Sequence, residues 1–500
     1  YLNEKTVTMP ADTIPPKTYA LIGGTTAMSN FKVYGKTIAI KSFPALLNDG
    51  MLLRLYDPQG NLVGFANYTK EWYNDSTRNG GGYSLECIDY SNLAEGKNNW
   101  RASIASEGGT PCAPNSVMAS NPDTTPPKLY YIEIPDSKKI HLFFSEPMDS
   151  LAATLQENYR TELNIYNITI GELYTRVTFE LAETLEPEKI YEISISGLTD
   201  FAGNTLPDTV IRVGLPQLAR KGDIVINEVL FNPYVGGTDF VELFNRSSKC
   251  FDLSHISIAN RNETDLTLKD VNPTSPLPKL FFPNEFAVIT VNPNQVTQFY
   301  YCQNPSSFIK VDKLPAFNND KGYVVLINSE NEVIDELRYT EKMHNRLLND
   351  VKGVSLERVN PNMPTNQSST WQSAAQAAGF ATPTYQNSQY TDLTESNSKF
   401  TLTPEIFSPD GDGRDDYLLI NYQLPEPGYV ANIRIFNANG IEIYRLANNL
   451  TLGTSGQLRW DGTDTQNRRV NSGIYIVYIE YFNLSGEVKR EKKTCVVGYR

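Results

Sequence analysis

The densest group of acidic residues in the chain lies in the segment PDGDGRDD, residues 409–416. Asp410, Asp412, Asp415 and Asp416 share one tight loop, where carboxylates repel each other unless a cation or hydrogen bonds neutralise them. Oxygen-rich loops of this kind suit Ca²⁺. The loop is not an EF-hand, because Arg414 holds the third ligand position, Asp415 the glycine position, and no Glu completes the twelve residues. Two readings stay open: a Ca²⁺ site, or a rigid turn whose aspartates cap backbone amides and pair with Arg414.

No other arrangement of residues predicts an active site. His141 and His255 stand in strand-like segments and His344 in a loop, and no GxSxG, P-loop, GxGxxG or HExxH motif is present. Asp239 and Glu242 are three residues apart in an expected strand, which sends them to opposite faces. The residues given therefore predict a chain without catalytic or cofactor-binding residues.

Composition and charge narrow the class of protein. The chain has 500 residues, 40% of them hydrophobic and 20% charged, which fits three or four globular domains. A net charge of −13 argues against nucleic-acid binding, since phosphate contacts need a positive face. The chain has no run of 18 apolar residues, so no transmembrane segment is predicted. The segment YLNEKTVTMP lacks the apolar stretch of a signal peptide. Short Val/Ile/Thr/Tyr runs, broken by Gly and Pro, predict an all-β chain of four Ig-like β-sandwich domains in series. No long helix is expected, and short helical turns are expected near 151–159 and 373–378.

One stretch of the sequence occurs twice. Five residues of the first copy meet their counterparts at a constant spacing of 271 (353 − 82 and 371 − 100): Gly82, Ser84, Leu85, Glu86 and Trp100, matched by Gly353, Ser355, Leu356, Glu357 and Trp371. The match extends over about 70 residues and indicates a duplicated module. Both glycines are expected at positive φ, and the Leu and Trp residues on opposite sheets of one core.

The two copies differ in their opening strands and their cysteines. The counterpart of residues 223–260 would precede residue 1, so we expect those strands in an upstream segment or in another chain. Cys87 and Cys112 occur in the first copy, where the second has Arg358 and Pro383 at the same offset. This predicts a Cys87–Cys112 disulfide, with Cys250–Cys302 as a second candidate pair and Cys495 left over; buried free thiols are the alternative.

The second copy resembles a lamin-tail domain, an Ig-like sandwich. The residues that carry the resemblance are INEVLFNP (226–233), DFVELFN (239–245), FDLS (251–254), GVSLERV (353–359) and Trp371. In DFVELFN, Val241 and Leu243 are expected to face the core and Glu242 to point outward. The resemblance covers 217–390, and residues 1–118 are expected to hold the C-terminal part of a second such domain. The family implies a secreted or surface protein and is not defined by a catalytic residue.

Two further domains are expected. FSEPMD (144–149) and DFAGN (200–204), after the stiff entry Pro126-Pro127, resemble the bacterial Ig-like domains of surface-layer proteins and adhesins over 122–216. There, Glu146 and Asp149 form a carboxylate pair, or Glu146 is a loop residue and Asp149 caps a short turn. Residues 396–500 resemble the Ig-like module of flagellar-hook capping proteins and of the C-terminal modules of Bacteroidota secreted proteins. Some relatives use that module as an export or attachment signal.

These resemblances imply a non-catalytic structural or binding protein on the outer-membrane surface of a Gram-negative, Bacteroidota-like bacterium. The expected partner is a protein at the cell surface, in one version an outer-membrane barrel complex whose external subunit this chain would be. Two alternatives remain. The chain could be the attachment region of a secreted enzyme whose catalytic domain lies upstream of residue 1, or a glycan-binding adhesin that uses aromatic residues such as Tyr73, Tyr300 and Tyr301.

Overall fold

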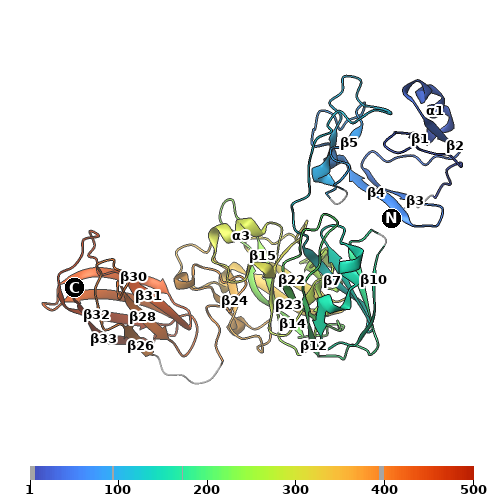
Figure 1. Cartoon of the computed structure of the whole chain (residues 1–500). Coiled ribbons are helices and arrows are strands. Elements are labelled where there is room, and N and C mark those ends of the chain that lie inside the picture. Colours follow the sequence, from blue (N-terminus) through green and yellow to red (C-terminus); the bar gives the residue numbers. More distant parts are fainter. Residues whose placement is uncertain (1–5, 93–94, 172, 393–398, 500) are drawn as a thin grey trace. The chain divides into compact units, whose positions relative to one another are not determined.

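The computed structural model consists mainly of β-strands, which confirms the predicted fold class (Figure 1). The structure describes residues 6–92, 95–171, 173–392 and 399–499. These form two compact units: residues 1–184 with 191–213, and residues 185–190 with 214–500. The α-helices are short: α1 (Thr25–Phe31), α2 (Ser150–Thr154) and α3 (Pro293–Phe299). In the described ranges, no helix is both long and apolar enough to cross a lipid bilayer.

The first part of unit 1 contains three two-stranded sheets. Its strands are β1 (Leu21–Gly24), β2 (Thr37–Ile40), β3 (Gly50–Tyr56), β4 (Leu62–Thr69), β5 (Leu85–Cys87) and β6 (Trp100–Ala102). β1 pairs with β2 in parallel, whereas β3 with β4 and β5 with β6 form antiparallel pairs. The buried apolar side chains of this part are few among the described residues: Met28, Ile38, Ile40 and Ala102. Its core is therefore only partly covered.

The second part of unit 1 is a small sandwich of two antiparallel sheets. Its strands are β7 (Leu129–Asp136), β8 (Lys139–Phe144), β9 (Tyr159–Thr161), β10 (Ile165–Ile170), β11 (Arg176–Leu181), β12 (Ile190–Ile195) and β13 (Thr209–Gly214). They follow the orders β10-β11-β8-β7 and β13-β12-β9. Ile140, Leu142 and Phe144 alternate along β8 and are all buried, as expected of a strand with one core face. Asp149 accepts a hydrogen bond from the Ala152 amide and caps α2, which confirms its predicted capping role.

The first part of unit 2 has the largest core. Its strands are β14 (Ile224–Leu230), β15 (Phe240–Asn245), β16 (Phe251–Asp252), β17 (Ser257–Arg261), β18 (Leu268–Pro273), β19 (Leu280–Phe281), β20 (Phe286–Thr290), β21 (Phe308–Lys310), β22 (Lys321–Ile327), β23 (Val333–Thr340), β24 (Leu356–Arg358) and β25 (Trp371–Ser373). A six-stranded sheet, β21-β20-β15-β14-β24-β25, and a four-stranded sheet, β18-β17-β22-β23, contribute to this apolar core.

The second part of unit 2 is another sandwich. Its strands are β26 (Lys399–Thr403), β27 (Ile406–Phe407), β28 (Leu418–Gln423), β29 (Val430–Asn437), β30 (Glu442–Thr451), β31 (Ser455–Trp460), β32 (Gly473–Phe482) and β33 (Val488–Val497). Sheets of order β26-β28-β31 and β27-β33-β32-β29-β30 enclose a core that includes Trp460, Phe400 and Tyr481. The predicted domain limits at 118, 122, 216, 390 and 396 stay predictions.

The duplication seen in the sequence extends to strand register. Leu85, Glu86 and Cys87 pair with Ala102, Arg101 and Trp100, and residues 356–358 pair with 373–371 in the same way. The β3–β4 hairpin likewise matches β22–β23, since 50 pairs with 69 and 321 with 340. The parallel pair β1–β2 flanks α1 just as the parallel pair β20–β21 flanks α3. The predicted positive φ is confirmed for Gly82 (82°) and Gly353 (74°).

The copies differ in what lies beside these strands. In the second copy β24 also pairs with β14, and β20 with β15. Among the described residues of the first copy, no strand takes either place beside β5 or β1. Trp371 is buried, whereas Trp100 is half-buried. The prediction that the Leu and Trp residues lie on opposite sheets is wrong, because Leu356 and Trp371 are on neighbouring strands of one sheet.

None of the five cysteines forms a disulfide bond, so neither predicted disulfide is present. The Cys87 sulfur contacts the Asp89 carbonyl at 3.4 Å, whereas the Cys112 sulfur lies against the Lys36 carbonyl at 3.5 Å. In the other predicted pair, Cys250 is next to the backbone of Gly214, and the Cys302 sulfur contacts the Tyr300 carbonyl at 3.5 Å. The two members of each pair thus meet different backbone groups.

Candidate functional site

Three glutamates are fully buried on one face of the six-stranded sheet. Glu228 comes from β14, Glu242 from β15 and Glu357 from β24. Glu228 stands opposite Glu242 on one side and opposite Glu357 on the other, so the three side chains share a face. We call these residues the glutamate cluster. The sequence predicted that Glu242 points outward to solvent; it does point away from the main core, but it is covered by another segment of the chain.

The covering segment comprises residues 380–390, here called the strap. Its backbone donates one amide hydrogen bond to each glutamate: Thr382 N–H to Glu228 Oε1 at 2.8 Å, Thr384 N–H to Glu242 Oε2 at 2.6 Å, and Gln389 N–H to Glu357 Oε2 at 2.8 Å. The strap has no strand partner of its own in the described structure. The buried carboxylates therefore take the place of a sheet ladder in satisfying its amides.

Side chains complete the hydrogen bonding of the cluster. Asn227 Nδ2 donates to Glu242 Oε1 at 2.8 Å, and the Ser355 hydroxyl donates to Glu228 Oε1 at 2.5 Å. The hydroxyls of Thr382 and Ser388, both in the strap, donate to the two oxygens of Glu357 at 2.7 and 2.8 Å. Each carboxylate is thus held by at least two donors of the same chain.

Burial raises the pKa of all three carboxyl groups. Desolvation is the largest cause in each case, and it raises the pKa of Glu242 to about 8. The negative charges of Glu242 and Glu357 add to the upward shift of the Glu228 pKa, and the pKa of Glu357 is raised as well. Shifted carboxyl groups often mark active sites. Here the strap covers them, so their geometry fits an anchor for the strap better than an acid or base facing a substrate.

In the first copy, Glu86 is the counterpart of Glu357 and makes equivalent contacts. The Thr110 hydroxyl donates to Glu86 Oε1 at 2.8 Å, and the Ser116 hydroxyl donates to Glu86 Oε2 at 2.7 Å. These residues correspond to Thr382, Ser388 and Glu357 of the second copy. Burial alone would raise the Glu86 pKa, but hydrogen bonds from Ser116, Thr110 and Ser103 outweigh it and the pKa is lowered. No second glutamate is among the causes of that shift.

The strap also contacts the second part of unit 2. Gln389 donates from Nε2 to the Leu452 carbonyl at 3.2 Å and accepts from the Gly428 amide at 3.1 Å. The Thr454 amide donates to the Ser388 carbonyl at 2.9 Å. Ser388 and Gln389, two of the three strap residues that bind Glu357, thus also contact the next sandwich.

The acidic loop 409–416 brings three of its four predicted ligands together. Carboxylate oxygens of Asp410, Asp412 and Asp416 lie within 4.8 Å of one another, but Asp415 is not part of this group. Asp416 accepts from the Gly411 and Gly413 amides at 2.6 and 2.8 Å. Asp412 accepts from the Arg414 amide at 2.8 Å. These contacts are those of a capped turn, and the Ca²⁺ site predicted for this loop stays a prediction.

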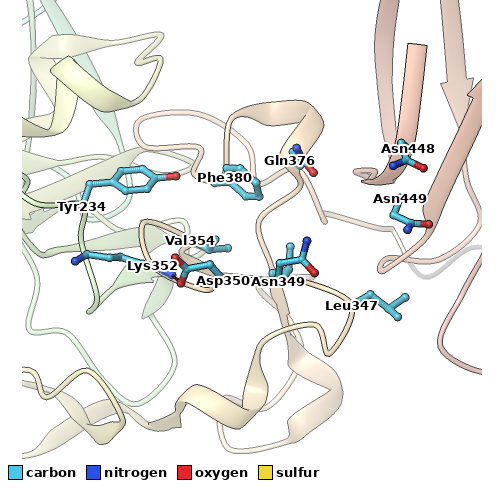
Figure 2. Close-up of a pocket in the computed structure, with 11 residues that line it drawn as sticks. Tyr234, Leu347, Asn349, Asp350, Lys352, Val354, Gln376, Phe380, Asn448 and Asn449 are labelled. Atoms are coloured by element: carbon cyan, nitrogen blue, oxygen red, sulfur yellow. Dashed lines mark hydrogen bonds between the residues drawn. The ribbon is translucent and has the colours of Figure 1, made fainter. Parts of the chain in front are cut away.

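An open groove of about 380 Å³ in unit 2 carries few ionisable groups (Figure 2). Asp350, Lys352 and Tyr234 are the ionisable side chains among its lining residues, which also include Leu347, Phe380 and Asn449.

Two of the three histidines contact other side chains in the described structure. His344 is buried against the Ser373 hydroxyl, and His141 contacts Glu133. Tyr300, one of the aromatic residues expected to meet a glycan, is buried and donates to the Gly353 carbonyl.

Sequence reasoning missed the glutamate cluster. A signal was present for two members, because Glu228 and Glu242 stand among mostly apolar residues in the strands IVINEVL and FVELFN. A strand buried on both faces has no outward position, and Ile224–Leu230 is buried along its whole length. The recurrence of Glu86 at the position of Glu357 was a second signal.

Two family models match the chain. Residues 217–341 match the lamin tail domain, and residues 401–497 match the CHU_C type IX secretion signal domain. No curated protein matches the sequence. Glu228 and Glu242 lie inside the first match, whereas Glu357 and the strap follow it.

Several solved structures resemble parts of the chain. The N-terminal part of the bacterial S-layer protein SbsC is 16% identical, with 33% of this chain and 41% of that chain covered and a TM-score of 0.18. Latent PorU of Porphyromonas gingivalis is 10% identical, with 78% and 35% covered and a TM-score of 0.17. PorZ of Porphyromonas gingivalis, a surface component of its type IX secretion system, is 10% identical, with 92% and 61% covered and a TM-score of 0.17. The chain spans less than two thirds of the length of each.

The matched domains are of structural and secretion-signal types rather than catalytic ones. A type IX secretion signal domain marks a protein that is secreted or displayed on the cell surface. The chain carries a lamin tail domain followed by a type IX secretion signal domain, and it is a secreted or cell-surface protein.

Proposed function

We propose that the chain is a non-catalytic structural or binding protein of the bacterial cell surface, exported by means of residues 401–497. Its β-domains present a surface to a protein partner, and in the more specific version of this proposal it is an external subunit of an outer-membrane assembly. The single observation that carries the proposal is the match of residues 401–497 to a type IX secretion signal domain.

The glutamate cluster supports the non-catalytic part of the proposal. Burial raises the pKa of Glu228, Glu242 and Glu357, and carboxyl groups with raised pKa values often mark active sites. A general acid or base must reach its substrate directly or through one water molecule. All three side chains are instead fully buried and bonded to the strap.

Export can be tested in a bacterium that has a working type IX secretion system. The full chain and a form that ends at residue 392 are expressed behind the same inner-membrane signal peptide. We expect the full chain at the cell surface or in the medium and the shortened form in the periplasm, measured by surface proteolysis and fractionation. Val210→Ala, a change at an exposed residue outside 401–497, serves as the matched full-length control. Equal export of the full and shortened chains would contradict the proposal.

The partner is tested separately by purification from outer membranes under native conditions. A partner present in a constant ratio to the full chain supports the assembly subunit. If the full chain reaches the surface but elutes alone at its own mass, the binding part of the proposal is wrong while the export part stands.

A further inference from the structure

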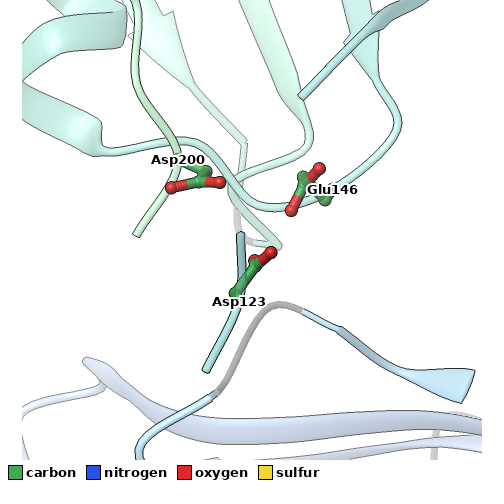
Figure 3. A group of neighbouring side chains, drawn as sticks. All are labelled: Asp123, Glu146 and Asp200. Atoms are coloured by element: carbon green, nitrogen blue, oxygen red, sulfur yellow. The ribbon is translucent and has the colours of Figure 1, made fainter. Parts of the chain in front are cut away.

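Three acidic side chains from three separate segments converge in unit 1 (Figure 3). Asp123 lies in the segment before Pro126-Pro127, Glu146 in the loop between β8 and α2, and Asp200 in the turn after β12. One carboxylate oxygen of each lies within 4.8 Å of the other two. We call these residues the joint cluster.

The joint cluster is buried and lacks a compensating charge. Asp123 is 8% exposed and Asp200 1% exposed, while Glu146 is half-buried. Within the described parts of the chain, no Lys, Arg or His forms an ion pair with any of the three. Buried charges without a partner are costly, so three carboxylates at this distance require a proton or a cation.

One oxygen of the joint cluster has no donor at all. Asp123 Oδ1 accepts the Thr125 amide at 2.9 Å, but Oδ2 is buried and meets no N–H or O–H donor in the described structure. Asp123 and Glu146 can bond each other only if one of them carries a proton. A buried acceptor left unsatisfied costs about 1–3 kcal/mol. Figure 3 shows the Asp123 carboxylate directed toward the other two residues.

The acidic loop at 409–416 provides a contrast within the same chain. It also brings three carboxylates within 4.8 Å, but two of its residues are only partly buried and one is exposed. Its oxygens accept amide hydrogen bonds from Gly411, Gly413 and Arg414. The joint cluster differs because a buried oxygen there remains unused.

The geometry points to a Ca²⁺ site formed by Asp123, Glu146 and Asp200. Ca²⁺ takes carboxylate oxygens at roughly 2.3–2.6 Å, so oxygens on opposite sides of one ion are about 4.8 Å apart. The set holds no Cys or His, which excludes the ligands that Zn²⁺ prefers. The cluster supplies three of the 6–8 oxygen ligands that Ca²⁺ typically takes, and backbone carbonyls or water supply the others.

The position of the site gives the ion a mechanical role. Two residues before Asp123, the Asn121 amide donates to Asp89 of the first copy at 2.8 Å. On the other side, Asn204 Nδ2 donates to the Asp123 carbonyl at 3.3 Å and to Asp200 Oδ2 at 2.8 Å. An ion bound to Asp123 and Asp200 would fix the short segment 121–127 to the sandwich that follows it.

The test uses the full chain, stripped of metal with a chelator and then titrated calorimetrically with CaCl₂ in the presence of millimolar Mg²⁺. We expect Glu146→Gln to weaken one site by roughly tenfold or more, because it removes a charged ligand without changing its size. Asp123→Asn is the second variant. Asp412→Asn, in the loop at 409–416, is the matched control and should leave that site unchanged.

Hydrogen exchange locates the bound ion. Ca²⁺ should slow amide exchange in 121–127, 145–149 and 200–204 of the wild-type chain, and not in Glu146→Gln. Asp200 also holds the turn through Asn204, so its substitution is not used. Identical titrations of the wild type and both variants would overturn the proposal. Protection confined to 408–416 would overturn it as well, and would assign the binding to the other loop.

Discussion

At the scale of single residues, the buried carboxylates of the glutamate cluster hold the strap against the six-stranded sheet. Glu357 accepts hydrogen bonds from both ends of the strap, through Thr382 near its start and Ser388 and Gln389 near its end. Removing one partner of a buried carboxylate leaves donors unsatisfied. The glutamate cluster therefore stabilises the position of the strap on the sheet.

Ionisation of the cluster predicts a dependence of stability on pH. Since the pKa of Glu242 is raised to about 8 from its ordinary value of 4.5, the folded chain binds more protons than the unfolded chain between those values. The free energy of unfolding should thus fall as the pH rises through that window, by up to about 5 kcal/mol. Asp239, with a pKa of about 7, acts in the same direction.

His344 sets the window for that measurement. Burial lowers its pKa to about 4, which makes stability rise with pH up to about 6.5 and opposes the glutamates there. Between pH 6.5 and 8 this opposition is absent. Scanning calorimetry should show a transition whose midpoint falls over that range, and a smaller fall in Glu242→Gln. A midpoint that rises from pH 6.5 to 8 would contradict the raised pKa values.

The paired glycines give a residue-scale prediction with its own control. A Cβ on Gly353 would lie 2.2 Å from the Tyr234 ring, whereas a Cβ on Gly82 would have no atom within 4 Å. Both glycines have positive φ. Gly82→Ala should therefore cost only the backbone strain of about 1–2 kcal/mol, and Gly353→Ala about 2–4 kcal/mol. Equal shifts in unfolding midpoints would show that the ring moves aside freely.

At the scale of elements, the two copies predict unequal protection of equivalent strands. β24 lies between β14 and β25, whereas β5 pairs only with β6 in the described structure. Amides of open strand edges exchange faster than those inside a sheet. Hydrogen exchange of the full chain should be slower at 356–358 than at 85–87. Equal protection would show that another strand covers β5 in solution.

The sequence predicted these elements well wherever the determinant was local. The positive φ of the paired glycines and the Asp149 cap depend on residues close in the chain. The role of Glu242 could not be read in the same way. Alternation within a strand separates two faces, but whether the second face meets water depends on residues 380–390, about 140 positions later. The predicted disulfides were wrong for a similar reason, since two cysteines that occur in the same copy need not be neighbours in space.

At the scale of the whole molecule, domains of two kinds share one chain. The lamin tail domain and the secretion signal domain lie in unit 2, while the joint cluster lies in unit 1. Export and Ca²⁺ binding therefore involve separate residues. A variant that loses the ion, such as Glu146→Gln, should be exported as well as the wild type.

The hydrogen bonds common to Glu86 and Glu357 also define a signature for detecting homologous modules. Both copies read Ser-Leu-Glu, then Thr-Pro, then Asn-Ser: 84–86, 110–111 and 115–116 in one, 355–357, 382–383 and 387–388 in the other. The polar members are the ones that bond the carboxylate and the strand backbone. A further module with these residues in this order should hold a buried carboxylate in the same way.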